Sequence, residues 1–399
     1  MLAEGEKLAI IRYMPDTELK SRRLISLDIF RGLTIAGMIL VNNPGSWEHI
    51  YPPLEHAAWN GLTPTDLIFP FFLFIVGVAV KYSLDKPLLG GLTPAKIRPR
   101  ILRRTAALFL LGEVLAGFPR YHLAAIRIPG VLQRIAVCYL AASFIYLWLA
   151  RAENGEIKFR PRAAAWLAGA LLALYYALMK FAPFPGGEAG SWAVPGATLA
   201  AWLDRAVFGV RHLWRNTETW DPEGILSTIP AVATALIGLL AGWWLETGKE
   251  RMEKAAGLLV AGCILAAAGY LASAFMPINK NLWTPSFVLV TGGLALLFLG
   301  VIYWYADIRG CRRATLPFLV YGSNAIAVYF LADIGAELMC MIKVKAGGAS
   351  CALIDFIYGR MLQPAFGDTL GSLVYAIGYV LFWLAAMWVL YRKKIFIKV

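Results

Sequence analysis

Residues 64–82 read PTDLIFPFFLFIVGVAVKY, and this stretch decides the fold class. Between Leu67 and Val80 it contains no charged residue. A helix rises about 1.5 Å per residue, so a segment of this length crosses the roughly 30 Å hydrocarbon core of a bilayer. Backbone groups inside a bilayer find no water, and a single segment can pair them internally only as a helix. The stretch therefore predicts a transmembrane helix.

Comparable apolar runs follow one another along almost the whole chain. Of its 399 residues, 59% are hydrophobic and only 16% are charged, against about 25% charged residues in soluble domains. We therefore predict an all-α, polytopic integral membrane protein with about ten transmembrane helices. The predicted spans are 24–41, 64–82, 101–118, 131–150, 163–181, 224–246, 254–275, 284–305, 314–340 and 368–391. They leave residues 1–23 and 392–399 as tails and make 24–391 a single membrane domain.

The chain carries a net charge of +13, and the placement of its basic residues accounts for it. If residues 1–23 are cytoplasmic, 26 of the 38 Lys and Arg belong to cytoplasmic segments and 10 to outer ones. This asymmetry follows the positive-inside rule. We therefore expect both termini in the cytoplasm and no nucleic-acid partner. The five cysteines lack metal-ligand spacing, and we expect no metal, haem or flavin site.

The longest outer loop, 182–223, contains a second kind of apolar pattern. Hydrophobic residues recur there at helical spacing, namely Leu199, Trp202, Leu203, Ala206, Val207, Val210, Leu213 and Trp214. A helix with one apolar face and one polar face lies in the membrane interface. We expect such an interfacial helix in this loop, with His212 on its wet side.

Polar side chains able to do chemistry gather near the outer ends of the predicted spans. They are Asn42, His56, Asn60, Gln133, Arg134, Asp221, Glu223, Lys280 and Trp283. The inner connections offer mainly basic residues, including Lys96, Arg98, Arg100, Arg103 and Arg104. This pattern indicates a reaction centre towards the outer face and an anion-attracting mouth on the inner face. The positive-inside rule alone also predicts basic inner loops, so the cluster has a second explanation.

His56 is the candidate general base. It is one of four histidines and sits beside Trp59 and Asn60 at the predicted membrane boundary. The unperturbed pKa of imidazole lies near neutrality, so the side chain can take a proton from an attacking group and return it.

The acids near the outer span ends have a structural interpretation. Thr63, Pro64 and Asp66 have the spacing of an N-cap, N1 and N3, which explains Asp66 without catalysis. Asp221 and Glu223 repeat this pattern around Pro222 before the sixth predicted span, so helix capping is the simpler interpretation of both.

Charged groups inside spans are costly and need partners. Asp28 and Arg31 lie three residues apart on the first predicted span, so they can pair on one helix face. Arg134 has no acid partner in its own helix and could meet Asp221, Glu223 or a substrate carboxylate across the bundle. Asn324 falls well inside the predicted span 314–340, where an amide more often joins helices than catalyses.

Six motifs in order carry a resemblance to a known family. They are SLDIFRGLTIAGMILVNNPG from 26, HAAWNGLTPTDLIFPFFLFIVG from 56, GVLQRIAVCYL from 130, DPEGILSTIPA from 221, INKNLWTPSFVLVTGG from 278 and YGSNAIAVYF from 321. Together they make the chain resemble, from about residue 24 to 391, the transmembrane acyltransferases typified by heparan-α-glucosaminide N-acetyltransferase. The stretch between Asn42 and His56 departs from the family pattern.

The resemblance implies an acetyltransferase. Family members pass acetyl from cytosolic acetyl-CoA to the amine of a terminal glucosamine on the opposite side of the membrane. The active histidine of the family falls on His56, and its asparagine after the first apolar run falls on Asn42. The resemblance also implies a homodimer, and for a bacterial homologue it implies the inner membrane and an amino-sugar acceptor at the periplasmic face.

These expectations combine into a mechanism. The phosphates of acetyl-CoA are expected at Arg98, Arg100, Arg103 or Arg104, with Arg31, Gln133 and Arg134 along the donor path. His56 is expected to deprotonate the acceptor amine while Asn42 donates to the developing oxyanion. We expect the donor or sugar to be oriented by Asp221, Glu223, Lys280, Trp283 and Asn60.

Three alternatives remain open at this level. Histidine can itself carry an acyl group, so a ping-pong route through acetyl-His56 competes with direct transfer. The acceptor could be a hydroxyl of an outer-face glycan. The chain could also be a small-solute transporter with kinked helices, although no inverted repeat is evident.

Overall fold

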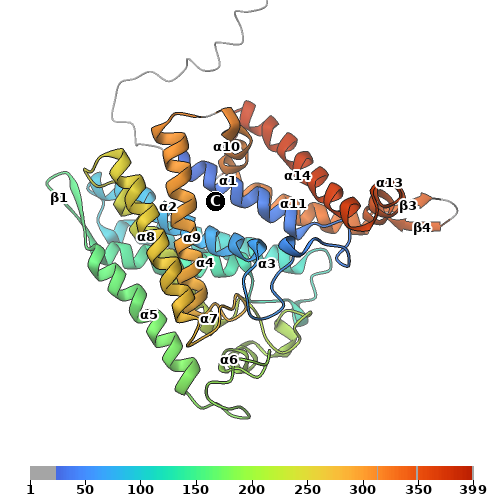
Figure 1. Cartoon of the computed structure of the whole chain (residues 1–399), viewed down its shortest axis with the longest axis horizontal. Coiled ribbons are helices and arrows are strands. Elements are labelled where there is room, and N and C mark those ends of the chain that lie inside the picture. The colour runs from blue at the N-terminus through green and yellow to red at the C-terminus, as the bar shows by residue number, and fades with distance from the viewer. Residues whose placement is uncertain (1–23, 312, 347–348, 398–399) are drawn as a thin grey trace, which may run out of the picture.

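The computed structural model describes residues 24–311, 313–346 and 349–397, and these form one helical bundle (Figure 1). The long helices are α1 Ile25–Asn42, α2 Ile68–Leu89, α3 Pro94–Gly117, α4 Val131–Leu149, α5 Pro161–Phe181, α7 Ile225–Leu245, α8 Arg251–Ala272, α9 Pro285–Ile302, α10 Leu316–Ser323, α11 Ala325–Met341 and α14 Asp368–Arg392. A π-helical turn at Tyr303–Ile308 extends α9.

Shorter elements connect the long helices. They are α6 Leu199–Phe208, α12 Leu353–Asp355, α13 Gln363–Phe366, a second π-helical turn at Phe356–Leu362, and 3₁₀ turns at Pro52–Leu54, Pro64–Leu67, Leu123–Ala125, Val210–His212 and Arg313–Thr315. Two antiparallel hairpins complete the described chain, β1 Ala150–Glu153 with β2 Glu156–Phe159 and β3 Lys343–Ala346 with β4 Ala349–Ala352. In Figure 1 both hairpins project from the periphery of the bundle.

The predicted all-α multi-pass architecture is confirmed. Eight helices in the described ranges are long and apolar enough to cross a membrane, and the bent pair α10–α11 raises this number to nine. The remaining predicted span corresponds to α3, which carries Arg103, Arg104 and Glu113 within its predicted crossing segment. Every predicted span therefore matches a helix or a helix pair.

The ninth predicted span, 314–340, was wrong as a continuous helix. The chain bends by 84° between α10 and α11, at Asn324, whose φ of −131° and ψ of 39° lie outside the helical region. Its side chain does not join two helices. Asn324 Nδ2 donates to the carbonyl of Ile395 at 3.0 Å, and Asn324 Oδ1 accepts the N–H of Ile397 at 2.8 Å. The amide therefore ties the break to the segment after α14.

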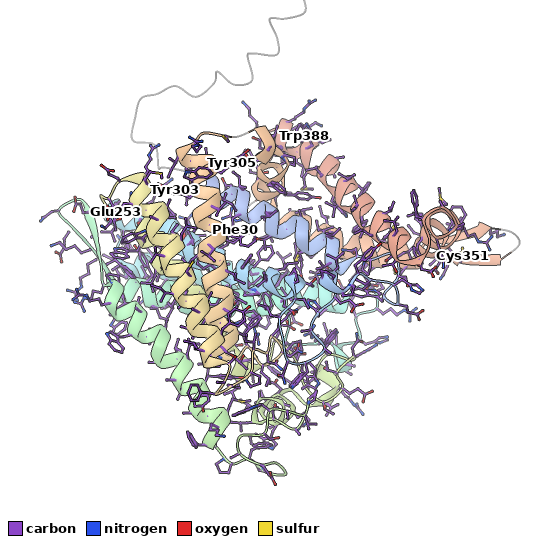
Figure 2. The ribbon with its side chains drawn as sticks, in the orientation of Figure 1. Phe30, Glu253, Tyr303, Tyr305, Cys351 and Trp388 are labelled. Carbon is purple, nitrogen blue, oxygen red and sulfur yellow. The ribbon has the colours of Figure 1, made fainter. Side chains whose placement is uncertain are left out.

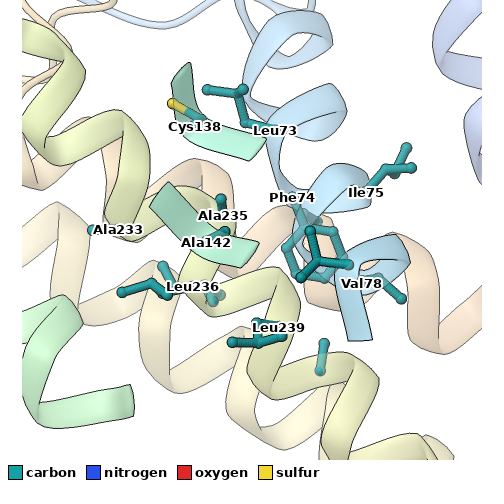
Figure 3. Packing of buried hydrophobic residues seen from close by; sticks show 14 of the residues in the cluster. Leu73, Phe74, Ile75, Val78, Cys138, Ala142, Ala233, Ala235, Leu236 and Leu239 are labelled. Atoms are coloured by element: carbon teal, nitrogen blue, oxygen red, sulfur yellow. The ribbon is translucent and has the colours of Figure 1, made fainter. Parts of the chain in front are cut away.

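Close helix crossings organise the core. Figure 3 shows α2, α4 and α7 packing through Leu73, Phe74, Cys138 and Leu236. At Gly77 a Cβ atom would lie 1.8 Å from the carbonyl oxygen of Ala235. Glycine therefore lets the α2 backbone touch the α7 backbone, as is usual for helices packed in membranes.

Phe30 marks the centre of the molecule. It is fully buried and its ring centroid lies 5.1 Å from that of Phe71 and 6.3 Å from that of Phe298. Figure 2 places Phe30 inside the bundle and Tyr303 near the end where α9 continues into its π-helical turn. We call this the basic end, because α3 begins there with its arginines, and call the other end the His56 end. Helices α2, α4, α7 and α9 begin at the His56 end.

The expected interfacial helix is shorter than its pattern. It ends at Phe208, because Gly209 has a φ of 73° and turns the chain away. His212 falls in the 3₁₀ turn that follows, where its Nδ1 lies 2.8 Å from the carbonyl oxygen of Ile126. The first part of the apolar pattern is therefore helical, and the rest is a separate turn.

Candidate active site

His56 lies at the His56 end of the bundle, in the loop that leads to the 3₁₀ turn Pro64–Leu67. Its Nδ1 is 2.7 Å from Asp66 Oδ1, and its side chain is 48% exposed, whereas that of Asp66 is 1% exposed. A buried carboxylate thus fixes one ring nitrogen of an imidazole that remains open to ligands. This is the arrangement of a general base with an orienting acid.

Asp66 has two tasks, of which the sequence indicated only one. The predicted capping box with Thr63 is confirmed, with the Thr63 N–H donating to Asp66 Oδ2 at 3.0 Å. The same oxygen accepts the Ala57 N–H at 3.1 Å, which pins the residue next to His56. The other oxygen holds the His56 ring. Asp66 is therefore a site residue that capping alone does not explain.

Lys280 approaches from the loop between α8 and α9. Its Nζ lies 2.9 Å from His56 Nδ1, 3.2 Å from His56 Nε2 and 3.5 Å from Asp66 Oδ1. Burial lowers the pKa of Lys280, although the negative charges of Asp66 and Glu223 oppose this shift. The structure thus places Lys280 and His56, two residues that the sequence predicted for the site, in contact with each other.

The two loops at the site are joined by further hydrogen bonds. Asn279 Nδ2 donates to Asn60 Oδ1 at 3.1 Å, and the Gly61 N–H donates to the carbonyl of Ile278 at 2.8 Å. Asn60 itself is exposed. By holding the two loops together, Asn60 therefore helps to place Lys280 relative to His56.

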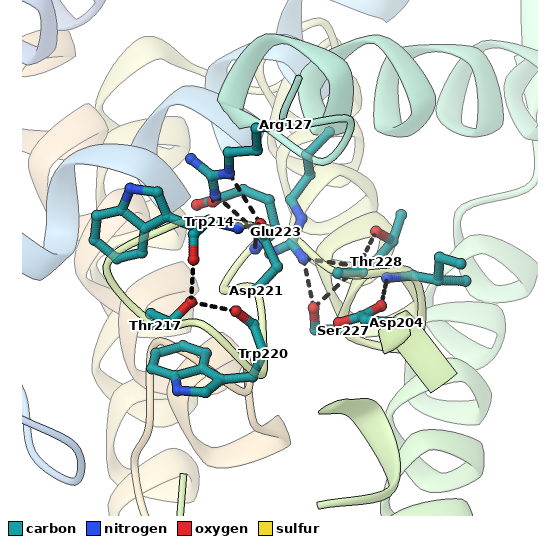
Figure 4. Close-up of polar contacts among 12 residues, drawn as sticks. Arg127, Asp204, Trp214, Thr217, Trp220, Asp221, Glu223, Ser227 and Thr228 are labelled. Atoms are coloured by element: carbon teal, nitrogen blue, oxygen red, sulfur yellow. Dashed lines mark hydrogen bonds and ion pairs between the residues drawn. The ribbon is translucent and has the colours of Figure 1, made fainter. Parts of the chain in front are cut away.

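Figure 4 shows a second polar cluster, whose Glu223 interacts electrostatically with Lys280. Arg127 donates from Nε and Nη2 to both oxygens of Asp221, at 2.9 and 2.6 Å, and also to Glu223. Burial alone would raise the pKa of Glu223, but Arg127, Arg134 and Lys280 outweigh it and hold that pKa below its usual value. Arg127, unassigned by the sequence, is thus the group that organises Asp221 and Glu223.

The capping interpretation of Asp221 and Glu223 was wrong. Helix α7 begins at Ile225, and its first N–H donates to Asp204 Oδ1 of α6 at 2.8 Å. Asp221 instead accepts the N–H groups of Trp214 and Glu223. The helix start is capped from a segment 21 residues away, which a local pattern cannot indicate.

Arg134 and Trp283 form the floor between the two clusters. Both are buried, and the Arg134 guanidinium lies 5.1 Å from the Trp283 ring centroid. Arg134 donates to the carbonyl of Gly224 at 3.0 Å and to Ser227, so it meets the backbone next to Glu223. Gln133 Nε2 donates to Glu113 at 3.1 Å. With 1% of its surface exposed, Trp283 supports the site from below.

Asn42 is the last residue of α1 and is exposed. Within the described ranges no hydrogen bond links Asn42 to His56. Its predicted catalytic role stays a prediction.

A cavity of about 920 Å³ opens between α1, α2, α3, α4 and α11. It follows α2 from Phe72 to Pro87, which is about 22 Å along a helix. Four of the basic residues assigned to the donor line it, namely Arg31, Arg100, Arg103 and Arg104. Arg98 is not among the lining residues and lies 5.9 Å from the Phe144 ring centroid. The predicted pair of Arg31 with Asp28 is confirmed at 3.1 Å.

The cavity ends short of His56. Towards the His56 end its lining includes Phe72, Val131 and Leu132, the last two being the first residues of α4. His56, Asp66 and Lys280 do not line it. The site is therefore a half-exposed His56, backed by the buried Asp66 and the largely buried Lys280, and it is separate from the arginine-lined cavity.

Comparison with known proteins matches residues 23–267 to the sequence model described as the catalytic region of heparan-alpha-glucosaminide N-acetyltransferase. That match covers more than half of the chain, including His56, Asp66 and the Arg127 cluster. The chain belongs to this family. The heparan-alpha-glucosaminide N-acetyltransferase of Mus musculus is 30% identical over 361 residues, and that of Homo sapiens is 31% identical over 350 residues.

These relatives are longer than the chain. The alignments cover 79% and 77% of this chain but 54% and 52% of the mouse and human proteins. The chain thus spans about half the length of the curated N-acetyltransferases it matches.

Proposed function

We propose that the chain is a transmembrane acetyltransferase that passes acetyl from acetyl-CoA, held in the cavity, to the amine of an amino sugar at the His56 end. The observation that carries this proposal is the pairing of His56 with the buried Asp66 beside Lys280. Family membership supports it, since the named relatives are N-acetyltransferases.

The donor cavity fits a thioester with a charged end and a slender arm. Arginine side chains Arg100 and Arg103 line its basic end, and guanidinium groups suit phosphates. Apolar residues such as Ile35, Ile75 and Val131 line its inner course. The nucleotide phosphates of CoA would stay at the basic end while the pantetheine arm extends towards the His56 end.

The transfer step follows from the geometry around His56. With Nδ1–H donating to Asp66, Nε2 carries the lone pair and accepts a proton from the acceptor ammonium or amine. The amine nitrogen then bonds to the thioester carbonyl carbon, the carbon–sulfur bond breaks, and CoA leaves as a thiolate that takes up a proton. Lys280 lies where its ammonium would stabilise the oxyanion formed on the way.

The acceptor side is formed by groups that surround His56 and Lys280. Asp221 and Glu223 are already engaged by Arg127, so we propose that this three-residue cluster acts as a unit that orients the sugar. Asn42 and Asn60 are exposed at the same end, and Asn60, whose Oδ1 accepts from Asn279, would offer its Nδ2 as a donor to the sugar.

A rearrangement must join the cavity to His56. Arg134 lies two residues after Leu132, which lines the cavity, and Trp283 lies three residues after Lys280; both are buried. We propose that movement of this floor admits the acetyl end of the donor. We also propose the cytoplasmic membrane of a bacterium as the location, both termini inside, and a homodimer.

The test is release of free CoA from acetyl-CoA by purified protein in detergent, with and without glucosamine. We expect glucosamine-stimulated release by the wild type and none by His56→Ala. Labelled acetyl that stays on the protein without acceptor would indicate the ping-pong route. Absence of release with any amino sugar, together with CoA-independent solute flux in liposomes, would replace the proposal by transport.

A further inference from the structure

The segment 393–397, which follows α14, folds back against the break between α10 and α11. The two hydrogen bonds of Asn324, to the Ile395 carbonyl and from the Ile397 N–H, hold it there at 3.0 and 2.8 Å. Asn324 is 1% exposed, so its amide would be costly to bury without these partners. We call residues 395–397 the clasped segment.

The clasped segment forms part of the cavity wall. Phe396 and Ile397 line the cavity together with Gly322 and Ser323 of the helix break. Arg31 of α1 belongs to the same lining, and Arg100 and Arg103 of α3 add two further guanidinium groups. The mouth at the basic end thus combines positive charge with an aromatic side chain.

Phe396 is the most exposed of the aromatic residues that line the cavity in the described chain. It is 42% exposed, although it borders a cavity. Tyr139 is 5% exposed, and the Arg104 guanidinium lies 4.8 Å from its ring centroid. Phe72 belongs to the first turns of α2, at the His56 end, and Tyr329 of α11 is half-buried. Among the described residues, Phe396 therefore offers the most open aromatic ring of the cavity lining, and it lies at the basic mouth.

We propose that Phe396 stacks on the base of the donor nucleotide and that Asn324 is the positioning residue that holds Phe396 in the mouth. A flat base stacks on an aromatic side chain, and the phosphates attached to it pair with guanidinium groups. The arrangement of Phe396 beside Arg31, Arg100 and Arg103 supplies both. This inference rests on the proposed function, because it assigns the nucleotide end of acetyl-CoA to this mouth.

The test compares binding of CoA with binding of pantetheine, which has the same arm without the nucleotide. Isothermal titration in detergent gives Kd for the wild type, Phe396→Ala and Phe396→Tyr. Loss of a stacked base weakens binding by about fivefold or more. We expect that increase for CoA with Phe396→Ala, a Kd near that of the wild type with Phe396→Tyr, and no change for pantetheine.

Phe382→Ala is the matched control, since Phe382 is 61% exposed on α14 and does not line the cavity. We expect wild-type binding of both ligands. Asn324→Ala should reproduce the CoA effect of Phe396→Ala, and the double variant should add little to either. Additive losses would separate Asn324 from Phe396 and remove its positioning role.

Two results would overturn the inference. One is an unchanged Kd for CoA with Phe396→Ala, and the other is an equal increase for CoA and pantetheine, which would mean a general effect on the cavity. The proposed function fails separately, if the wild type binds CoA but releases none from acetyl-CoA with any acceptor. A wild type that does not bind CoA would remove both.

Discussion

Asp66 links the fold to the chemistry at a single residue. Asp66→Asn keeps a side-chain oxygen for the cap at Thr63, but it removes the negative charge that orients and stabilises a protonated His56. We expect the rate of amino-sugar-dependent CoA release to fall about 100-fold or more, with little change in melting temperature. Steady-state rates and thermal unfolding in detergent measure both.

Thr63→Ala provides the matched control. It removes the hydroxyl of the capping box and leaves the pair of Asp66 with His56 in place. We expect a loss of stability of about 1 kcal/mol and nearly unchanged turnover. Equal losses of turnover in the two variants would show that Asp66 acts only through the cap.

The lowered pKa of Lys280 leads to a prediction about how the reaction rate depends on pH. Because burial lowers its pKa, its ammonium loses a proton at a lower pH than an ordinary lysine does. If the ammonium stabilises the transition state, the wild-type rate falls as pH rises through that range. Lys280→Arg stays protonated, so its alkaline limb should move to higher pH in a pH–rate profile. Superimposable limbs would exclude the ammonium from the rate-limiting step.

The sequence singled out His56 and Lys280, which the structure brings into contact, but it did not indicate that Asp66 and Arg127 support the site. His56 and Lys280 are polar residues at span ends, and their position alone marked them. Asp66 was explained by a local pattern, which concealed its second contact. Arg127 lies between two spans near Pro129, and nothing in its neighbourhood predicts a bidentate contact with Asp221, 94 residues away. Long-range pairing of charges is not contained in local spacing.

The start of α7 depends on a carboxyl group from another element. Burial raises the pKa of Asp204 to about 7, so between about pH 4 and pH 7 the folded state binds a proton that the unfolded state has lost. The free energy of unfolding therefore falls as pH rises through this window. Asp204→Asn keeps the acceptor for the Ile225 N–H and removes the dependence.

We therefore expect Asp204→Asn to melt at the same or a higher temperature than the wild type at about pH 8, and to lose this advantage at about pH 5. Asp204→Ala, which lacks the acceptor, should melt lower at both. Parallel melting curves of wild type and Asp204→Asn across the range would contradict the assigned titration.

The contact between α2 and α7 gives a prediction about packing. A Cβ at Gly77 would lie 1.8 Å from a backbone oxygen of α7, so Gly77→Ala must push the helices apart. We expect a loss of about 1–3 kcal/mol, seen as a lower melting temperature. Gly169→Ala on α5 is the matched control, since nothing lies within 4 Å of its Cβ, and it should be neutral or slightly stabilising.

Elements were predictable where hydrophobicity alone decides them. Spans such as α7 and α9 are uninterrupted apolar runs, and their helices lie within a few residues of expectation, whereas α2 continues past its apolar run to Leu89, seven residues beyond the predicted end. The break at Asn324 was not predictable, because one amide in an apolar run looks the same whether the helix continues or bends. The side chain at the break pairs with the backbone of Ile395 and Ile397, about 70 residues along the chain, and local spacing does not contain this contact.

The lining of the cavity leads to a prediction about which arginines bind the donor. Arg103 lines it and Arg98 does not. Hydrogen bonds to charged groups contribute about 1.5–3 kcal/mol, so we expect Arg103→Gln to raise KM for acetyl-CoA about tenfold, while Arg98→Gln leaves it nearly unchanged. Equal effects of both variants would indicate general attraction by the basic surface, which added salt should then abolish.

The floor formed by Arg134 and Trp283, on which Phe69 packs, also bears on whether ions can leak across the membrane. Trp283 packs edge-to-face on Phe69 with their ring centroids 5.0 Å apart, and neither residue lines the cavity. A water-filled passage from end to end would conduct protons and dissipate the ion gradient across the membrane. If the proposed movement of the floor opens it only during transfer, the cavity never becomes a passage from end to end, and the membrane keeps its ion gradient.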